Sequence, residues 1–137
     1  MEFYRIIIAD DQPLHRESLE KTLTRVLPSA TVFNASKGEQ VLEILSKAII
    51  DLIFMKFPMY GNDGFQTALD IRKTNPDIKI IAITESDDKP TIEKLFRAGV
   101  NGYIHKTIDK QGLQSAIAAM SNGEIFVPQL FKNESAL

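Results

Sequence analysis

The sequence predicts an α/β protein: a five-stranded, doubly wound parallel sheet with helices on both faces. Short apolar runs that are rich in isoleucine and barely alternate in polarity are typical of strands buried on both faces. Segments with helical periodicity lie between these runs. The order is therefore β-α repeated five times, which indicates parallel strands joined by right-handed crossovers.

Five runs are predicted to form the strands. The three strongest lie at residues 6–9, 52–55 and 78–83. Two weaker runs, at residues 31–35 and 102–105, are expected nearer the edges of the sheet.

Start and stop signals delimit the first three helices. Pro28 ends the first helix, because proline cannot continue the backbone hydrogen bonding. Ser36 and Glu39 have the spacing of a capping box at the start of the second. Asn62 or Asp63 is expected to cap the third.

The last two helices carry similar signals. Negative charge at Asp87-Asp88 suits the start of the fourth helix, and Pro90 suits its first turn. Gly99 is predicted to provide its left-handed exit. Thr107 or Asp109 is expected to open the fifth helix.

Composition narrows the class of protein. The 137 residues suit one domain, predicted at residues 1–122, with residues 123–137 as a linker or C-terminal tail. With 16 Lys and Arg against 18 Asp and Glu, the net charge of −2 leaves no basic excess for holding nucleic acid. The absence of cysteine excludes disulfides and thiol chemistry. No apolar run approaches the ~18 residues of a membrane span, so the cytoplasm is the expected location.

Polar residues stand where the predicted strands end. Asp10 and Asp11 follow the first, Lys56 the third, Thr84 the fourth and Lys106 the fifth. The carboxyl ends of parallel strands meet at one edge, where open α/β sheets bind ligands. We therefore expect two carboxylates, a hydroxyl and two amines to face one another. For any one of them alone, simple contact with water is the alternative explanation.

Four segments resemble the receiver domain of two-component response regulators: residues 7–11, 51–64, 82–85 and 102–106. Residues 121–128 also resemble the joint in the branch of transcription factors that carries a helix-turn-helix module after the receiver. The resemblance implies a flavodoxin-like fold of five βα units. It also implies a site in which an acidic pair helps to hold Mg²⁺ and an aspartate ending the third strand receives a phosphoryl group from a histidine kinase. A Thr or Ser and a Lys bind the phosphoryl oxygens.

Two positions depart from the family pattern. Lys56 stands where the phosphoacceptor aspartate is expected, and Tyr60 where the family usually has proline. A charged lysine has three donors and no lone pair, so it can neither attack phosphorus nor ligate Mg²⁺. Its ammonium is expected to lie between Asp10 and Asp11. The prediction is a pseudo-receiver that is not phosphorylated at the usual position, needs no cofactor, and binds Mg²⁺ weakly or not at all.

Neighbouring residues do not replace the missing aspartate. Asp51 begins its strand and so belongs to the opposite edge of the sheet, and Asp63 suits a helix cap better. A packing or solvent-facing role is favoured for His15 over phosphoryl relay. Glu85 and Lys89 are expected to be solvated surface residues.

Three further residues match switch and phosphate-site positions of the family. Thr84 and Tyr103 correspond to the pair that couples the site to the outer surface. The alternative for Thr84 is to bond nearby backbone groups, and for Tyr103 to be an ordinary β residue. Lys106 is expected to pair with Asp10 or Asp11 in place of a phosphate.

The favoured function is a non-enzymatic signalling module. It is expected to act through a protein partner or as the regulatory domain of a transcription regulator. The resemblance implies descent from receivers that take their phosphoryl group from a histidine kinase. A homodimer or partner is expected at the fourth helix, fifth strand and fifth helix, or at the first and fifth helices. The alternative is a phosphorylation-independent DNA-binding regulator whose helix-turn-helix domain lies beyond Leu137, so that DNA is contacted only through a domain not present here. A Schiff-base enzyme using Lys56 would need a depressed lysine pKa, whereas acidic neighbours raise it.

Overall fold

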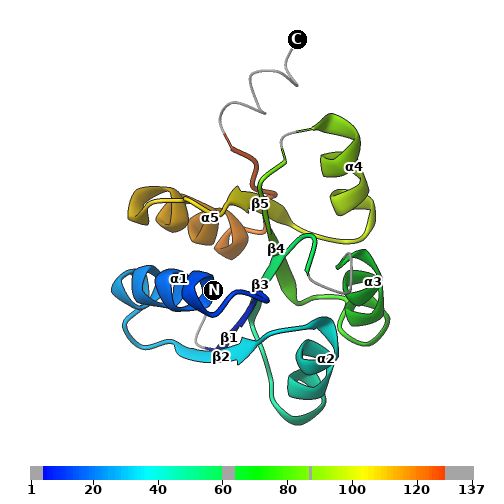
Figure 1. Cartoon of the computed structure of the whole chain (residues 1–137), viewed down its shortest axis with the longest axis horizontal. Helices are drawn as coiled ribbons and strands as arrows, with labels where there is room; N and C mark the ends of the chain where they lie inside the picture. Colours follow the sequence, from blue (N-terminus) through cyan, green and yellow to red (C-terminus); the bar gives the residue numbers. More distant parts are fainter. Residues whose placement is uncertain (1–4, 60–63, 87, 129–137) are drawn as a thin grey trace.

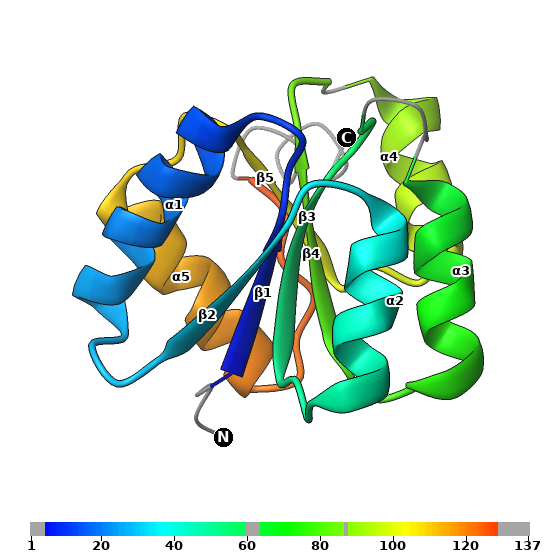
Figure 2. The ribbon, with the colours of Figure 1, turned by 60° about the horizontal axis from the view of Figure 1, so that its bottom comes forward.

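Five parallel strands form one sheet between two layers of helices. The computed structural model describes residues 5–59, 64–86 and 88–128. The strands are Arg5–Ala9 (β1), Thr31–Ala35 (β2), Leu52–Lys56 (β3), Lys79–Thr84 (β4) and Gly102–His105 (β5), and the helices are Pro13–Val26 (α1), Gly38–Lys47 (α2), Phe65–Thr74 (α3), Lys89–Arg97 (α4) and Lys110–Ser121 (α5). The sheet order is β2-β1-β3-β4-β5, with every pair parallel. Helices α1 and α5 cover one face and α2, α3 and α4 the other (Figure 1, Figure 2). The predicted α/β fold is confirmed, with the two weaker runs at the edges.

Successive residues of the central strands supply two separate cores. Ile7 and Ile53, which are register partners, face the core under α2, α3 and α4. Their neighbours Ile6 and Leu52 face the core under α1 and α5. Because side chains alternate across a strand, a strand buried on both faces must be apolar at nearly every position. This is why the isoleucine-rich runs predict the interior of the sheet.

The helix starts agree with the sequence in two cases. Asp88 Oδ2 accepts the N–H of Thr91 at 2.8 Å at the start of α4, and Pro90 lies in its first turn. Asp109 Oδ1 accepts the N–H of Gly112 at 2.7 Å at the start of α5. Each carboxylate satisfies a backbone donor that has no partner within the helix.

The capping box predicted for α2 is wrong. The helix begins at Gly38, and the N-cap residue Lys37 makes no side-chain cap. The N–H and hydroxyl of Ser36 both donate to Gln40 Oε1, at 2.6 and 3.0 Å, so the side chain that reaches back is Gln40 and not Glu39. Ser36 lies two residues before the helix, one place too early for the box. The caps predicted at Asn62 and Asp63, and Asp87 of the predicted acidic pair, lie outside the described residues. Helix α3 follows Gly64, which is in the left-handed conformation.

Residues 124–128, which we call the edge segment, lie along β5. Figure 1 shows this part of the chain, in orange to red, beside that strand. Phe126 forms a parallel bridge with Gly102. Its N–H donates to Asn101 O, and its carbonyl accepts from Tyr103 N, both at 3.0 Å. The sequence predicted a linker or tail from residue 123, and at least its first residues are hydrogen-bonded to the sheet.

We expect Gly102→Ala to displace the edge segment. A Cβ on Gly102 would lie 2.7 Å from Phe126 O, a backbone atom that can retreat only if the segment moves. The expected loss is about 1–3 kcal/mol of unfolding free energy, measured by urea unfolding, with faster hydrogen exchange at the Tyr103 amide.

Gly112→Ala is the matched control. Its Cβ would approach only side-chain atoms, the nearest being Ile108 Cγ1 at 2.8 Å and Asp109 Oδ1 at 3.2 Å, and these can move without displacing the backbone. Because alanine is a better helix former than glycine, this variant should be neutral or slightly stabilising. Equal losses for the two variants would contradict the role given to Phe126.

Candidate functional site

The predicted polar residues meet at the carboxyl-terminal edge of the sheet. Asp10, Lys56, Thr84 and Lys106 line a cleft of about 320 Å³ whose apolar walls include Phe57 and Ile83. Asp51 lies at the opposite edge, where its Oδ2 accepts the N–H of Arg5 at 2.9 Å. The strand ends thus bring together groups that are distant in the sequence, and Asp51 is separated from them as predicted.

The amine of Lys56 lies between the two carboxylates. Its Nζ is 3.1 Å from Asp11 Oδ1 and 3.7 Å from Asp10 Oδ1. The Asp10 side chain is 3% exposed, Asp11 16% and Lys56 20%. A buried carboxylate without a partner costs several kcal/mol, so the amine compensates charge that the surrounding apolar strands could not tolerate alone.

Asp10 is held by further contacts from the start of α1. Its Oδ1 accepts the N–H of Gln12 at 2.8 Å, and its carbonyl accepts from Arg16 Nη1 at 2.6 Å. His15 Nδ1 lies 3.5 Å from Asp10 Oδ2. The solvent-facing or packing role expected for His15 is therefore incomplete: although its side chain is 39% exposed, the ring nitrogen faces the site. The first turn of α1 thus contacts the residue that follows β1. Helical periodicity alone does not predict these contacts.

Lys106 does not pair with Asp10 or Asp11, and that prediction is wrong. Its Nζ lies 2.6 Å from Glu85 Oε1, in a pair that remains largely exposed. The hydrogen bond and charge of Lys106 hold the pKa of Glu85 below its usual value. Lys56 already lies between the two carboxylates, and Lys106 pairs instead with the acid that follows β4. Glu85, expected from the sequence to be a solvated surface residue, is the partner of Lys106.

Comparison with known proteins identifies the family. The model of the response regulator receiver domain matches residues 6–118, which is most of the chain. The chain belongs to this family. A glycerol metabolism activator from Pseudomonas putida is 27% identical over 126 residues, 91% of this chain and 57% of that protein. The nitrate/nitrite response regulator NarP from Escherichia coli is 30% identical over 120 residues, 88% of this chain and 56% of that protein.

A solved structure gives the same picture. The crystal structure of a LuxR-family two-component response regulator from an Aurantimonas species matches with a TM-score of 0.88 and 25% identity, covering 98% of this chain and 96% of that one. The receiver described here spans about half the length of the curated relatives it matches. None of its helices within the described residues has the length and apolar character that a bilayer span requires.

The receiver keeps Lys56 protonated. Burial by itself would lower the pKa of the amine, but the hydrogen bond to Asp11 and the charges of Asp10, Asp11 and Glu85 outweigh that effect and raise it. A protonated amine has no lone pair to offer to an electrophile or a metal. At neutral pH Lys56 is therefore a fixed cation.

Thr84 and Tyr103 are both buried in the receiver. Thr84 Oγ1 accepts the N–H of Ser86 at 3.1 Å, so its hydroxyl bonds a nearby backbone group. Tyr103 is fully buried in the core under α2, α3 and α4, and its ring lies edge-on to His105 at 6.5 Å. The aromatic ring is already directed inward. The switch roles of both residues stay predictions.

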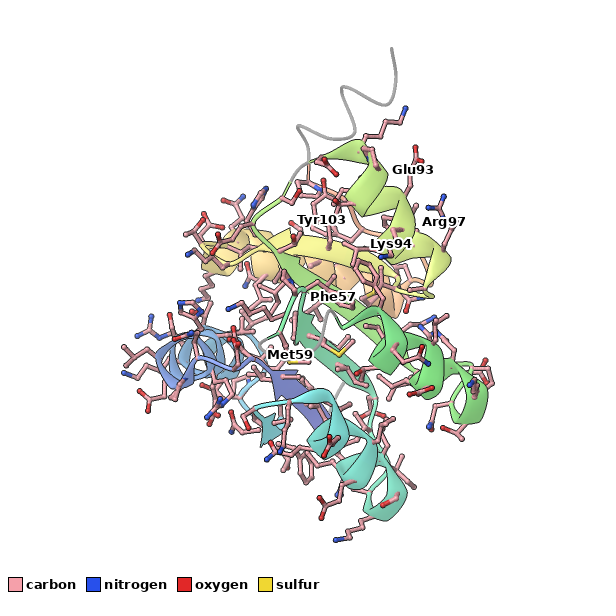
Figure 3. All side chains as sticks on the ribbon, turned by 45° about the vertical axis from the view of Figure 1, so that its right-hand side comes forward. Phe57, Met59, Glu93, Lys94, Arg97 and Tyr103 are labelled. Atoms are coloured by element: carbon pink, nitrogen blue, oxygen red, sulfur yellow. The ribbon has the colours of Figure 1, made fainter. Side chains whose placement is uncertain are left out.

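A contact that no sequence pattern predicts joins the segment after β3 to α4. The rings of Phe57 and Phe65 are 5.4 Å apart, and Lys94 Nζ lies 4.0 Å from the centroid of Phe65, a cation–π distance. Figure 3 shows Phe57 after β3 and Lys94 on α4. Gly64, at φ 82°, leaves room for the Phe57 ring, which a Cβ would approach to 2.8 Å. No periodic pattern reports such a contact between a loop and a distant helix.

The two lysines of the site are expected to differ in their effect on stability. Lys56→Met keeps the apolar stem but leaves Asp10 buried beside Asp11 without a cation, which should cost about 1–3 kcal/mol of unfolding free energy. Lys106→Met removes an exposed pair and should cost at most about 1 kcal/mol. Urea unfolding with a metal chelator present measures both. Equal losses would contradict the assignment of Lys56 as the counterion.

The raised pKa of Lys56 predicts a loss of stability at alkaline pH. In the unfolded chain lysine loses its proton at pH ~10.4, and in the folded chain at a higher pH. The ion pair's contribution is fully present below the unfolded pKa and is lost as pH rises through the folded pKa. The difference in unfolding free energy between the native protein and Lys56→Met should therefore shrink in that alkaline range. A difference that stays constant would contradict the raised pKa.

Proposed function

We propose that this receiver is a pseudo-receiver: a signalling module that is not phosphorylated at the usual position and acts through protein–protein interaction, alone or as the regulatory domain of a transcription regulator. The observation that carries the proposal is Lys56, whose amine pairs with Asp10 and Asp11 at the end of β3. The family's chemistry needs a carboxylate there to form an acyl phosphate. An ammonium cannot supply that bond.

The same residues are a poor fit for the family's Mg²⁺ ion. Mg²⁺ requires near-octahedral oxygen ligands at about 2.0–2.1 Å. Asp10 and Asp11 offer suitable oxygens, but the group that completes the cluster is a cation that repels a divalent ion. We infer that Mg²⁺ binding is weak or lost, and we derive no chemical step that depends on the ion.

A fixed cation also favours one conformation of the site. In the family, the site changes its charge when the phosphoryl group arrives, and that change drives the switch. Here Lys56 supplies a permanent positive charge, and the Phe57–Phe65–Lys94 contact ties the segment after it to α4. The proposed module therefore presents one state of the surface formed by α4, β5 and α5, on which Glu93 and Arg97 point away from α4 (Figure 3). The faces of α1 and α5 are the second candidate surface for a partner or a second copy.

The second candidate is a phosphorylation-independent DNA-binding regulator whose helix-turn-helix domain lies beyond Leu137. The chain spans 57% of the glycerol metabolism activator and 56% of NarP, which leaves room in such proteins for a further domain. In that case residues 1–122 would be the regulatory domain, and the edge segment would lead towards a DNA-binding module. A reading frame that continues past Leu137 into a helix-turn-helix supports this candidate, and a stop codon at that point contradicts it.

Lys56→Asp is expected to restore phosphoryl acceptance. With acetyl phosphate and Mg²⁺, the variant should gain the mass of one phosphoryl group at residue 56, because a carboxylate then completes the acidic cluster. The native protein should gain none. Intact-mass spectrometry followed by peptide mapping measures both, and Mg²⁺ titration followed by NMR reports the metal.

Lys56→Asn is the matched control for this experiment. Asparagine has nearly the size of aspartate and also removes the cation, but it cannot form an acyl phosphate. It should remain unmodified. Phosphorylation of the native protein within this cluster, or Mg²⁺ binding as tight in the native protein as in Lys56→Asp, would contradict the pseudo-receiver proposal.

A further inference from the structure

The sequence contains two Asn-Gly pairs, and the fold places them in opposite environments. Asn101 and Gly102 lie at the start of β5, where Gly102 is buried beneath Phe126. Asn122 and Gly123 end α5, and both are exposed. Asparagine followed by glycine is a thermolabile sequence, because glycine has no side chain to shield its backbone nitrogen.

We propose that Asn122 is a site of spontaneous deamidation that controls the attachment of the edge segment to β5. The backbone nitrogen of Gly123 loses its proton to solvent base and attacks Cγ of Asn122. A C–N bond forms, the bond to the side-chain nitrogen breaks, and ammonia leaves. Water then opens the five-membered succinimide at either carbonyl, giving aspartate or isoaspartate. Water is the only co-reactant, so atoms and charges balance without an enzyme.

The surroundings of Asn122 favour this reaction. Its side-chain amide makes no hydrogen bond to another of the described residues. A Cβ placed on Gly123 would have no atom within 4 Å apart from its chain neighbours, so no side chain crowds this residue. The pair also directly follows the last turn of α5, and helix ends open at a much smaller free-energy cost than the core.

The end of α5 must open before the nitrogen of Gly123 can reach Cγ of Asn122. Gly123 has φ 74°, and its N–H donates to Met120 O at 3.1 Å, while the N–H of Glu124 donates to Ala119 O at 2.9 Å. These two bonds form a Schellman motif. The nitrogen of Gly123 is free to attack only when this cap opens. The rate should therefore follow both fraying of α5 and the hydroxide concentration.

Asn101 is protected from the same reaction. Its Oδ1 accepts from Ile80 N at 2.9 Å and from Arg72 Nη2 at 2.8 Å, which fixes the side-chain amide. The Arg72 guanidinium also donates to Gly99 O, so it ties α3 to the turn before β5. Attack at Asn101 would require the edge of the sheet to open. Asn101 therefore serves as an internal control that should deamidate slowly.

The product has a structural consequence at the edge of the sheet. Either acid adds a negative charge at the carboxyl end of α5, beside Glu124, where the helix dipole disfavours it. Isoaspartate also adds one atom to the backbone, which the Schellman turn cannot accommodate. Phe126 lies three residues beyond Gly123, so its bonds to Asn101 O and Tyr103 N weaken. Deamidation therefore loosens the joint between the receiver and whatever follows it.

Ageing of the folded protein tests this proposal. The native chain is incubated in mildly alkaline buffer, and deamidation and isoaspartate at each asparagine are followed by peptide mass spectrometry and isoaspartyl methyltransferase labelling. Asn122 should convert at least about a hundredfold faster than Asn101, since core segments open at several kcal/mol greater cost than helix ends. Hydrogen exchange at Tyr103 should accelerate in the aged fraction.

Three comparisons make the test decisive. Asn122→Gln should block conversion at this position and keep the slow exchange at Tyr103, whereas Asn122→Asp should reproduce part of the acceleration by its charge alone. A free peptide of residues 118–126 gives the unprotected rate. Equal conversion at Asn101 and Asn122 would overturn the proposal. So would an Asn122 that stays intact in the folded chain while the peptide converts, or a Tyr103 exchange rate that does not change with ageing.

Discussion

The ion pair of Lys56 with Asp10 and Asp11 is the constraint on which the functional edge of this receiver depends. Parallel strands converge there, and two carboxylates are held at the end of an apolar strand with little exposure. Such a cluster must acquire positive charge from some source. Relatives of the family acquire it from a divalent ion. Here one side chain supplies it, and the charge is therefore present at all times.

The remaining groups of the cleft arrange themselves around that fixed charge. Lys106 pairs outside the cluster, with Glu85. Thr84 bonds the backbone of Ser86 and Tyr103 is already buried. Each of these three residues is thus held by other contacts or by burial. The site combines the fold of a receiver with the electrostatics of a structural ion pair.

Two connections lead from this edge to the outer surface. One passes from the segment after β3 through the Phe57–Phe65 pair to Lys94 on α4. The other runs along β5, whose free edge is covered by Phe126. The connection to Lys94 is stabilised by aromatic packing. The connection along β5 depends on the short turn at Asn122 and Gly123, where fraying of α5 and the proposed deamidation both occur. Stability is therefore unequal along the two paths.

Sequence alone determined that helices cover both faces of the sheet, which strands lie inside it, and which residues end each strand. The inner strands β1, β3 and β4 could be recognised because burial on both faces demands apolar residues at nearly every position. It also determined that a cation ends β3 next to two acids. Only the tertiary structure decided that Lys106 binds Glu85, that His15 faces Asp10, that Gln40 bonds Ser36, and that Phe126 covers β5. These contacts join flexible side chains or loops across the fold. Each of these side chains has several possible partners within reach. Which partner it contacts depends on distances between elements, and a local sequence pattern does not contain those distances.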